Sequence, residues 1–113
     1  MHELSLAMEV IDLAAREAKK NRISIIQEIR IEVGDLSGVE ADAFEMALKL
    51  SVKGSVLENA IIHIIRTPGK GKCTFCDLEF EMKHMFSTCP QCHSYASEIN
   101  GGREFRVLSI AGE

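Results

Sequence analysis

The sequence has few aromatic residues, no long apolar run and no excess of positive charge. It contains no tryptophan and a single tyrosine among 113 residues, so its core must be built mainly from aliphatic side chains. It has no stretch of eighteen or more apolar residues, which excludes a membrane span. Thirteen basic residues against seventeen acidic ones give a net charge of −4, which disfavours binding to nucleic acid.

The sequence also lacks the short motifs that mark common enzymes and exported proteins. There is no glycine-rich phosphate loop, no G-x-S-x-G turn and no H-E-x-x-H helix, so nucleotide hydrolysis and metalloprotease chemistry find no support. The first eighteen residues have no basic start, no long apolar core and no small-residue cleavage site. We therefore expect a cytoplasmic protein that is not an enzyme.

Four cysteines form two Cys-x-x-Cys pairs, Cys73 with Cys76 and Cys89 with Cys92. Two such turns facing each other supply the four thiolates that tetrahedral Zn²⁺ takes, and this favours one structural zinc site. Structural disulfides and covalent haem at the Cys-Pro-Gln-Cys-His segment would both require export. Iron in a rubredoxin-like electron carrier uses the same four thiolates, and the spacing cannot choose between the two metals.

Hydrophobic periodicity predicts the body of the fold. Apolar residues at steps of three and four between Leu4 and Ala18 indicate an amphipathic helix, which we expect to bury Met8. Alternation from Ile23 to Val33 indicates a half-buried strand, with Ile29, Ile31 and Val33 facing the core. The stretch from Glu40 to Lys53 is predicted to be a second helix, with Phe44, Ala47 and Leu48 on its core face and Met46 also in the core.

The later part of the chain changes in composition. Isoleucines of both parities between Ala60 and Arg66 predict a strand buried on both faces in the middle of a sheet, and Phe105 to Ile110 is strand-like again. We expect an α+β fold in which residues 1–69 and 97–113 form a small αβαβ(β) mixed-sheet domain with two helices. Residues 70–96 are expected to form a four-cysteine zinc ribbon inserted between two sheet strands.

The sequence opens with Met1, His2 and Glu3, which can bind a metal in a specific way. The terminal amine, the deprotonated amide nitrogen of His2 and its imidazole can close two fused chelate rings around an ion that accepts planar nitrogen ligands, notably Ni²⁺ or Cu²⁺. The Glu3 carboxylate could complete such a site. Taken alone, a histidine at position two is more often an exposed residue with no special role.

Taken together, these features resemble the HypA/HybF family of nickel-insertion proteins in hydrogenase maturation. The resemblance covers the whole chain and rests on the Met1-His2-Glu3 opening, the segment from Ile31 to Ser37 and the paired cysteine motifs. It implies a nickel-binding α/β domain joined to a zinc domain. It implies nickel ligands at Met1, His2 and Glu3, with Glu40 as a further candidate, and zinc at Cys73, Cys76, Cys89 and Cys92.

The resemblance further implies a metallochaperone that delivers Ni(II), its transient cargo, while Zn(II) has a structural role. The implied partners are a HypB-type nickel GTPase and the precursor of the [NiFe]-hydrogenase large subunit, and in some organisms urease maturation proteins. An exposed edge strand could support a homodimer. Two alternatives stay open: a zinc-ribbon interaction module with no nickel role, and the rubredoxin-like carrier. His84 and His93 could contact or replace a zinc ligand, although solvated histidines are commoner.

Overall fold

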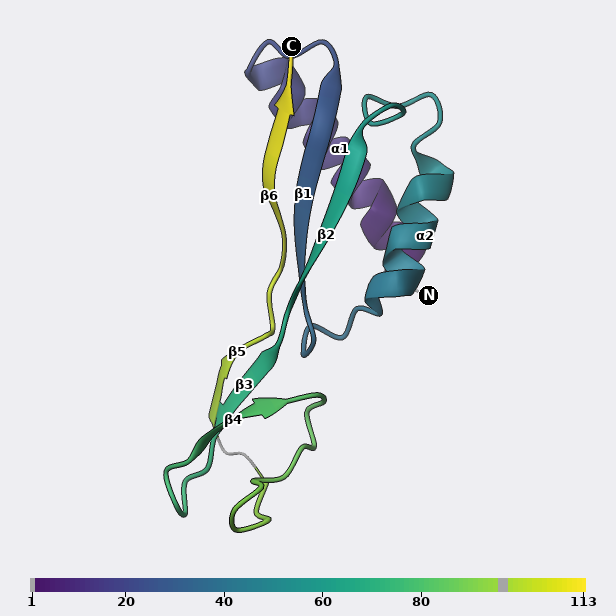
Figure 1. Cartoon of the computed structure of the whole chain (residues 1–113). Coiled ribbons are helices and arrows are strands. Elements are labelled where there is room, and N and C mark those ends of the chain that lie inside the picture. The colour runs from purple at the N-terminus through teal and green to yellow at the C-terminus, as the bar shows by residue number, and fades with distance from the viewer. Residues whose placement is uncertain (1, 96–97) are drawn as a thin grey trace. The chain divides into compact units, whose positions relative to one another are not determined.

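The computed structural model describes residues 2–95 and 98–113, which form two helices and six strands (Figure 1). Along the chain the elements are α1 (His2–Lys20), β1 (Ile26–Gly34), α2 (Ala41–Ser51), β2 (Ile61–Thr67), β3 (Gly69–Lys72), β4 (Glu79–Met82), β5 (Glu98–Gly101) and β6 (Phe105–Gly112). The strands make two three-stranded sheets, in the orders β2-β1-β6 and β4-β3-β5. The expected α+β class is confirmed. Among the described residues, no helix combines the length and apolar character that a bilayer span requires.

The chain divides into two compact units. Unit 1 comprises Met1–Glu32, Glu40–Ile65 and Arg106–Glu113, and unit 2 comprises Val33–Val39 and Arg66–Phe105. Unit 2 therefore includes the short segment that follows β1 as well as the cysteine-rich part of the chain. The assignment of a nickel-binding domain and a zinc-ribbon domain to the expected residue ranges stays a prediction.

In unit 1, both helices pack on one side of the β2-β1-β6 sheet, with α1 running behind the strands (Figure 1). The helices also pack against each other. Helix α1 buries a stripe of small and branched residues, and α2 buries Phe44 and Leu48 completely. Strand β1 alternates as predicted, with Ile29, Ile31 and Val33 buried. Burying one such large side chain stabilises the fold by about 1.5–3 kcal/mol.

Three expectations about burial were wrong. Strand β2 lies at an edge of its sheet, not in the middle, and Ile61 is 59% exposed. The helices cover only one face of this sheet, so isoleucines of one parity face the helices and those of the other parity are left without a covering layer. Met8 and Met46 are 48% and 66% exposed because the buried stripes of their helices are narrower than the apolar pattern suggests.

In unit 2, β3 is the central strand and pairs antiparallel with β4 and β5. Its alternate residues Gly69 and Gly71 are buried, and a Cβ at Gly69 would lie 2.6 Å from Cγ of Leu36. The loop after β1 is tied to the same unit, because the Leu36 backbone N–H donates to the Gly102 carbonyl at 2.6 Å. Leu36 and Met82 are buried, so this small unit packs a few apolar side chains against glycine backbone.

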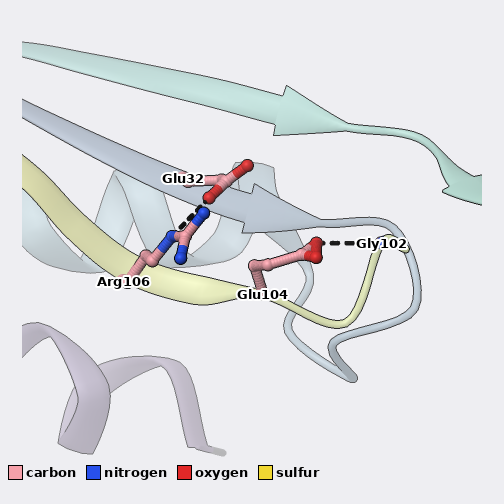
Figure 2. Close-up of polar contacts among 4 residues, drawn as sticks. All are labelled: Glu32, Gly102, Glu104 and Arg106. Carbon is pink, nitrogen blue, oxygen red and sulfur yellow. Dashed lines mark hydrogen bonds and ion pairs between the residues drawn. The ribbon is translucent and has the colours of Figure 1, made fainter. Parts of the chain in front are cut away.

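Figure 2 shows two polar contacts, one made by β6 itself and one in the turn just before it. Arg106 of β6 donates through Nε to Oε1 of Glu32 on β1 at 2.7 Å, an ion pair within unit 1. The Glu104 side chain accepts a hydrogen bond from the Gly102 backbone N–H at 2.9 Å within unit 2. The first contact links the neighbouring strands β1 and β6 of the β2-β1-β6 sheet, and the second orders the turn that precedes β6.

Candidate metal centres

The first cysteine knuckle is a tight turn closed by backbone hydrogen bonds. The Asp77 N–H donates to the Cys73 carbonyl at 2.9 Å, and the Cys73 N–H donates to the Leu78 carbonyl at 3.0 Å. Asp77, the residue after the second cysteine, has a φ of 59°, in the left-handed region where, among residues other than glycine, aspartate, asparagine and histidine are enriched. This turn brings Cys73 and Cys76 to one side of the loop.

The second knuckle repeats the first, position by position. The His93 N–H donates to the Cys89 carbonyl at 2.8 Å, and the Cys89 N–H donates to the Ser94 carbonyl at 2.7 Å. His93 has a φ of 63° and so occupies the position that Asp77 holds in the first knuckle. The equal spacing of Asp77 and His93 after their cysteine pairs could have indicated this shared turn in the sequence.

The two knuckles bring the four sulfurs together. Ligand atoms of Cys73, Cys76, Cys89 and Cys92 all lie within 4.8 Å of one another. The Sγ–Sγ distances are 3.3 Å for Cys73 and Cys92, 3.6 Å for Cys76 and Cys89, and 3.9 Å for Cys76 and Cys92. Four sulfurs around zinc, each about 2.3 Å from the ion, would be separated by roughly 3.8 Å. The cluster therefore has the donor set and the size of a closed tetrahedral site.

Without an ion, the pKa values of Cys76 and Cys92 are shifted in opposite directions. The Ser94 hydroxyl and backbone N–H, helped by Cys73, lower the pKa of Cys92 to about 6. The Leu78 backbone N–H lowers the pKa of Cys76, but desolvation and the three neighbouring sulfurs outweigh it and raise that pKa to about 12. A metal that binds all four thiolates must therefore displace a firmly held proton from Cys76.

The N-terminal candidate site lies in unit 1. Met1, the first predicted nickel ligand, is outside the described residues. His2 is the first residue of α1 and is exposed. The first amides of a helix have no carbonyl partner within it. The Glu3 carboxylate lies at the start of α2, where its Oε2 accepts a hydrogen bond from the Glu40 backbone N–H at 3.4 Å.

Glu40 has a structural role of its own. It is the N-cap of α2, and its Oε2 accepts a hydrogen bond from the Ala43 N–H at 2.6 Å. A capping carboxylate accepts a hydrogen bond from an unpaired N–H of the first helical turn. Its negative charge is also attracted by the positive end of the helix dipole. The structure thus brings Glu3 and Glu40 together although they are 37 residues apart.

The other histidines lie outside the cysteine cluster. His84 Nδ1 accepts a hydrogen bond from the Phe86 N–H at 3.2 Å, and His63 Nε2 pairs with Glu28 Oε1 at 3.0 Å on the sheet of unit 1. His93 is exposed at its turn position. Within residues 2–95 and 98–113, the four cysteines are the one group of three or more His, Cys, Asp or Glu side chains whose ligand atoms lie close enough together to hold a metal ion.

The fold and this cluster define a class: a small α+β protein of two units, one of which carries a closed four-cysteine metal site. The family model described as "Hydrogenase/urease nickel incorporation, metallochaperone, hypA" matches residues 1–112. The chain belongs to this HypA family. It is accordingly a nickel metallochaperone of hydrogenase maturation and not an enzyme.

Individual relatives agree with this assignment. The hydrogenase maturation factor HypA of Parabacteroides distasonis is 43% identical over 110 residues, which cover 97% of this chain and 96% of that protein. The factor of the same name from Geobacter metallireducens is 35% identical over the whole length of both chains. The solution structure of the Ni metallochaperone HypA from Helicobacter pylori matches with a TM-score of 0.65 at 28% identity, covering 96% of this chain and 94% of that one.

Proposed function

We propose that the chain binds Ni(II) at its N-terminus and delivers it to the [NiFe]-hydrogenase large-subunit precursor, while its four cysteines hold a structural zinc. The observation that carries the nickel site is the position of His2 and Glu3 in the first turn of α1, with Glu3 oriented by the Glu40 N–H. The ligand set is the Met1 amine, the His2 amide and imidazole nitrogens, and Glu3. Direct binding by Glu40 would use Oε1, because Oε2 caps α2.

An exposed site of this kind suits a carrier. Nickel binding requires loss of protons from the amine, the amide and the imidazole, so the return of those protons favours release. The His2 side chain is open to solvent, which leaves room for an acceptor protein to exchange ligands at the ion. We propose a HypB-type GTPase as the partner that drives this exchange, with urease maturation proteins as further recipients.

The proposed zinc site stabilises unit 2. This unit buries few large apolar side chains, and the sulfurs of Cys73 and Cys89 belong to its buried interior. A small unit of this kind gains folding free energy directly from its metal. We assign nickel binding to residues 1–69 and 97–113 and zinc binding to the ribbon of residues 70–96.

Nickel calorimetry with zinc analysis tests the proposal on four forms of the full chain: the native chain, His2→Ala, one glycine added before Met1, and His63→Ala. The added glycine keeps His2 but displaces the amine. His63 is the matched control, because it is an exposed histidine of the same unit that pairs with Glu28. We expect the first two variants to lose nickel binding and His63→Ala to keep it, with one zinc per chain in all four.

Other outcomes have definite meanings. If both N-terminal variants bind nickel like the native chain, the N-terminal site is wrong. If the protein contains iron and is red when oxidised, the cysteine cluster is a rubredoxin-like centre. Transfer of radioactive nickel from the loaded chain to the large-subunit precursor, with and without the GTPase, tests delivery, and equal transfer in both cases contradicts a role for the GTPase.

A further inference from the structure

The four cysteines differ in how far solvent reaches them. Cys73 and Cys89 are fully buried. Cys76 and Cys92 are both half-buried as members of the sulfur cluster, but Cys92 taken as a whole residue is exposed whereas Cys76 is not. A bound dication deprotonates the thiols that ligate it, so in the loaded site all four sulfurs are thiolates. Access then decides which sulfur reacts with a dissolved oxidant. Of the two half-buried cysteines, Cys92 is the more exposed residue, so we expect a dissolved oxidant to reach its sulfur before that of Cys76.

A second sulfur lies next to Cys92. Cys73 Sγ is 3.3 Å away, closer than Cys76 Sγ at 3.9 Å. A disulfide has its sulfurs about 2.05 Å apart, so from the roughly 3.8 Å expected around a bound zinc the Cys92 sulfur must approach Cys73 by somewhat under ~2 Å. Cys73 is itself buried, so an oxidant does not reach it directly, but it can react with an oxidised Cys92.

We propose that Cys92 is an oxidative modification site and that hydroperoxides convert Cys92 and Cys73 into a disulfide that expels the zinc. This inference rests on the zinc site of the proposed function. It adds a route by which unit 2 loses its structural zinc, and this route depends on an oxidant and not on nickel. The disulfide joins the same two knuckles that the ion joins, and it leaves only Cys76 and Cys89 as thiolate ligands.

The oxidation of Cys92 and Cys73 to a disulfide takes two steps. The Cys92 thiolate attacks one oxygen of hydrogen peroxide, the O–O bond breaks, and hydroxide leaves while Cys92 becomes a sulfenic acid. The Cys73 thiolate then attacks the Cys92 sulfur, the S–S bond forms, the S–O bond breaks, and a second hydroxide leaves. Two protons from solvent convert the hydroxides to water. The two thiolates supply the two electrons that reduce the peroxide.

The test treats the full zinc-loaded chain with hydrogen peroxide. A colorimetric chelator follows zinc release, dimedone traps sulfenic acid, and peptide mapping after alkylation identifies the disulfide. We expect one zinc released per chain, dimedone on Cys92, and a disulfide between Cys73 and Cys92. The proposal is overturned if dimedone first labels Cys76, if Cys76 forms the disulfide, or if zinc stays bound at peroxide concentrations that oxidise glutathione.

Two matched variants separate reactivity from metal binding. Cys92→His and Cys76→His each keep four zinc ligands, three cysteines and one histidine, which is a common structural zinc site. Since reactivity follows thiolate access, we expect peroxide to release zinc at least about tenfold more slowly from Cys92→His and at a near-native rate from Cys76→His. Equal rates in the two variants contradict the proposal.

The experiment also separates this inference from the zinc site on which it rests. An untreated native chain without zinc overturns the proposed zinc site. A zinc-loaded chain whose Cys92 does not react overturns only the oxidation proposal. If Cys92→His fails to bind zinc, peptide mapping of the native chain still decides between the outcomes.

Discussion

Replacing Gly102 with alanine tests the packing of unit 2 most directly. Gly102 has a φ of +94°, which side chains of L-residues rarely adopt. A Cβ at this position would lie 2.4 Å from Cα of Gly69 and 3.0 Å from the carbonyl oxygen of Pro68. Both neighbours are backbone atoms, so no side-chain rotation can relieve the overlap. We expect the substitution to strain the turn and to push apart two segments of unit 2.

The size of the effect follows from the unfavourable φ and from the steric overlap of the added Cβ. A left-handed conformation costs a residue with a Cβ about 1–2 kcal/mol. Overpacking adds about 1–3 kcal/mol. Gly102→Ala should therefore lower the free energy of unfolding by roughly 2–5 kcal/mol, a large part of the ~5–15 kcal/mol that stabilises a typical domain.

Two other glycines of unit 2 provide matched controls. Gly38 has a φ of +83° with nothing within 4 Å of the place that a Cβ would occupy, so Gly38→Ala should show only the conformational cost of about 1–2 kcal/mol. Gly101 precedes Gly102, has no positive φ and also faces open space. Gly101→Ala should change the stability by less than about 0.5 kcal/mol.

The assay can observe each unit separately. The single tyrosine, Tyr95, lies in unit 2, and the chain has no tryptophan, so tyrosine fluorescence during urea unfolding reports on that unit. Both helices lie in unit 1, so circular dichroism at the helix band reports mainly on unit 1. If Gly102→Ala and Gly38→Ala show the same free energy of unfolding by fluorescence, the steric argument is refuted.

Three further predictions concern the caps, the thiols and the sheet. Glu40→Ala removes the N-cap of α2 and should destabilise unit 1 by about 0.5–2 kcal/mol in urea unfolding followed by circular dichroism; an unchanged midpoint argues against the cap. Above pH 6, zinc affinity should rise with pH, because Cys76, with its pKa raised to about 12, still holds a proton that zinc must displace, whereas Cys92, at about 6, is already a thiolate. Calorimetry in buffers of different ionisation enthalpy measures the protons released when zinc binds. If none are released, Cys76 does not hold the proton assigned to it. A double-mutant cycle on Glu32 and Arg106 should give no more than about 1 kcal/mol, because the Arg106 side chain is 63% exposed and water screens the pair; a larger coupling would mean that the pair is better shielded.

The sequence alone was sufficient for features that depend on neighbouring residues. The helical period predicted α1 and α2, and the alternation in β1 identified Ile29 and Ile31 as buried. The spacing of the cysteines predicted one cluster, because a two-residue spacer fixes the shape of each knuckle and four thiolates complete a single coordination shell. The same motifs, with the Met-His-Glu opening, led to the correct family.

Only the tertiary structure decided what depends on distant segments. Isoleucines of both parities in β2 suggested a central strand, but the order β2-β1-β6 places it at an edge, since its position depends on which strands pair and not on its own composition. Met46 has an apolar side chain at a helical position, yet the narrow buried stripe of α2 leaves it exposed. The contact between Glu3 and Glu40 and the close approach of Gly69 and Gly102 join residues more than thirty positions apart. Local periodicity carries no record of such contacts, because they form only when the chain closes on itself and selects one packing of its elements.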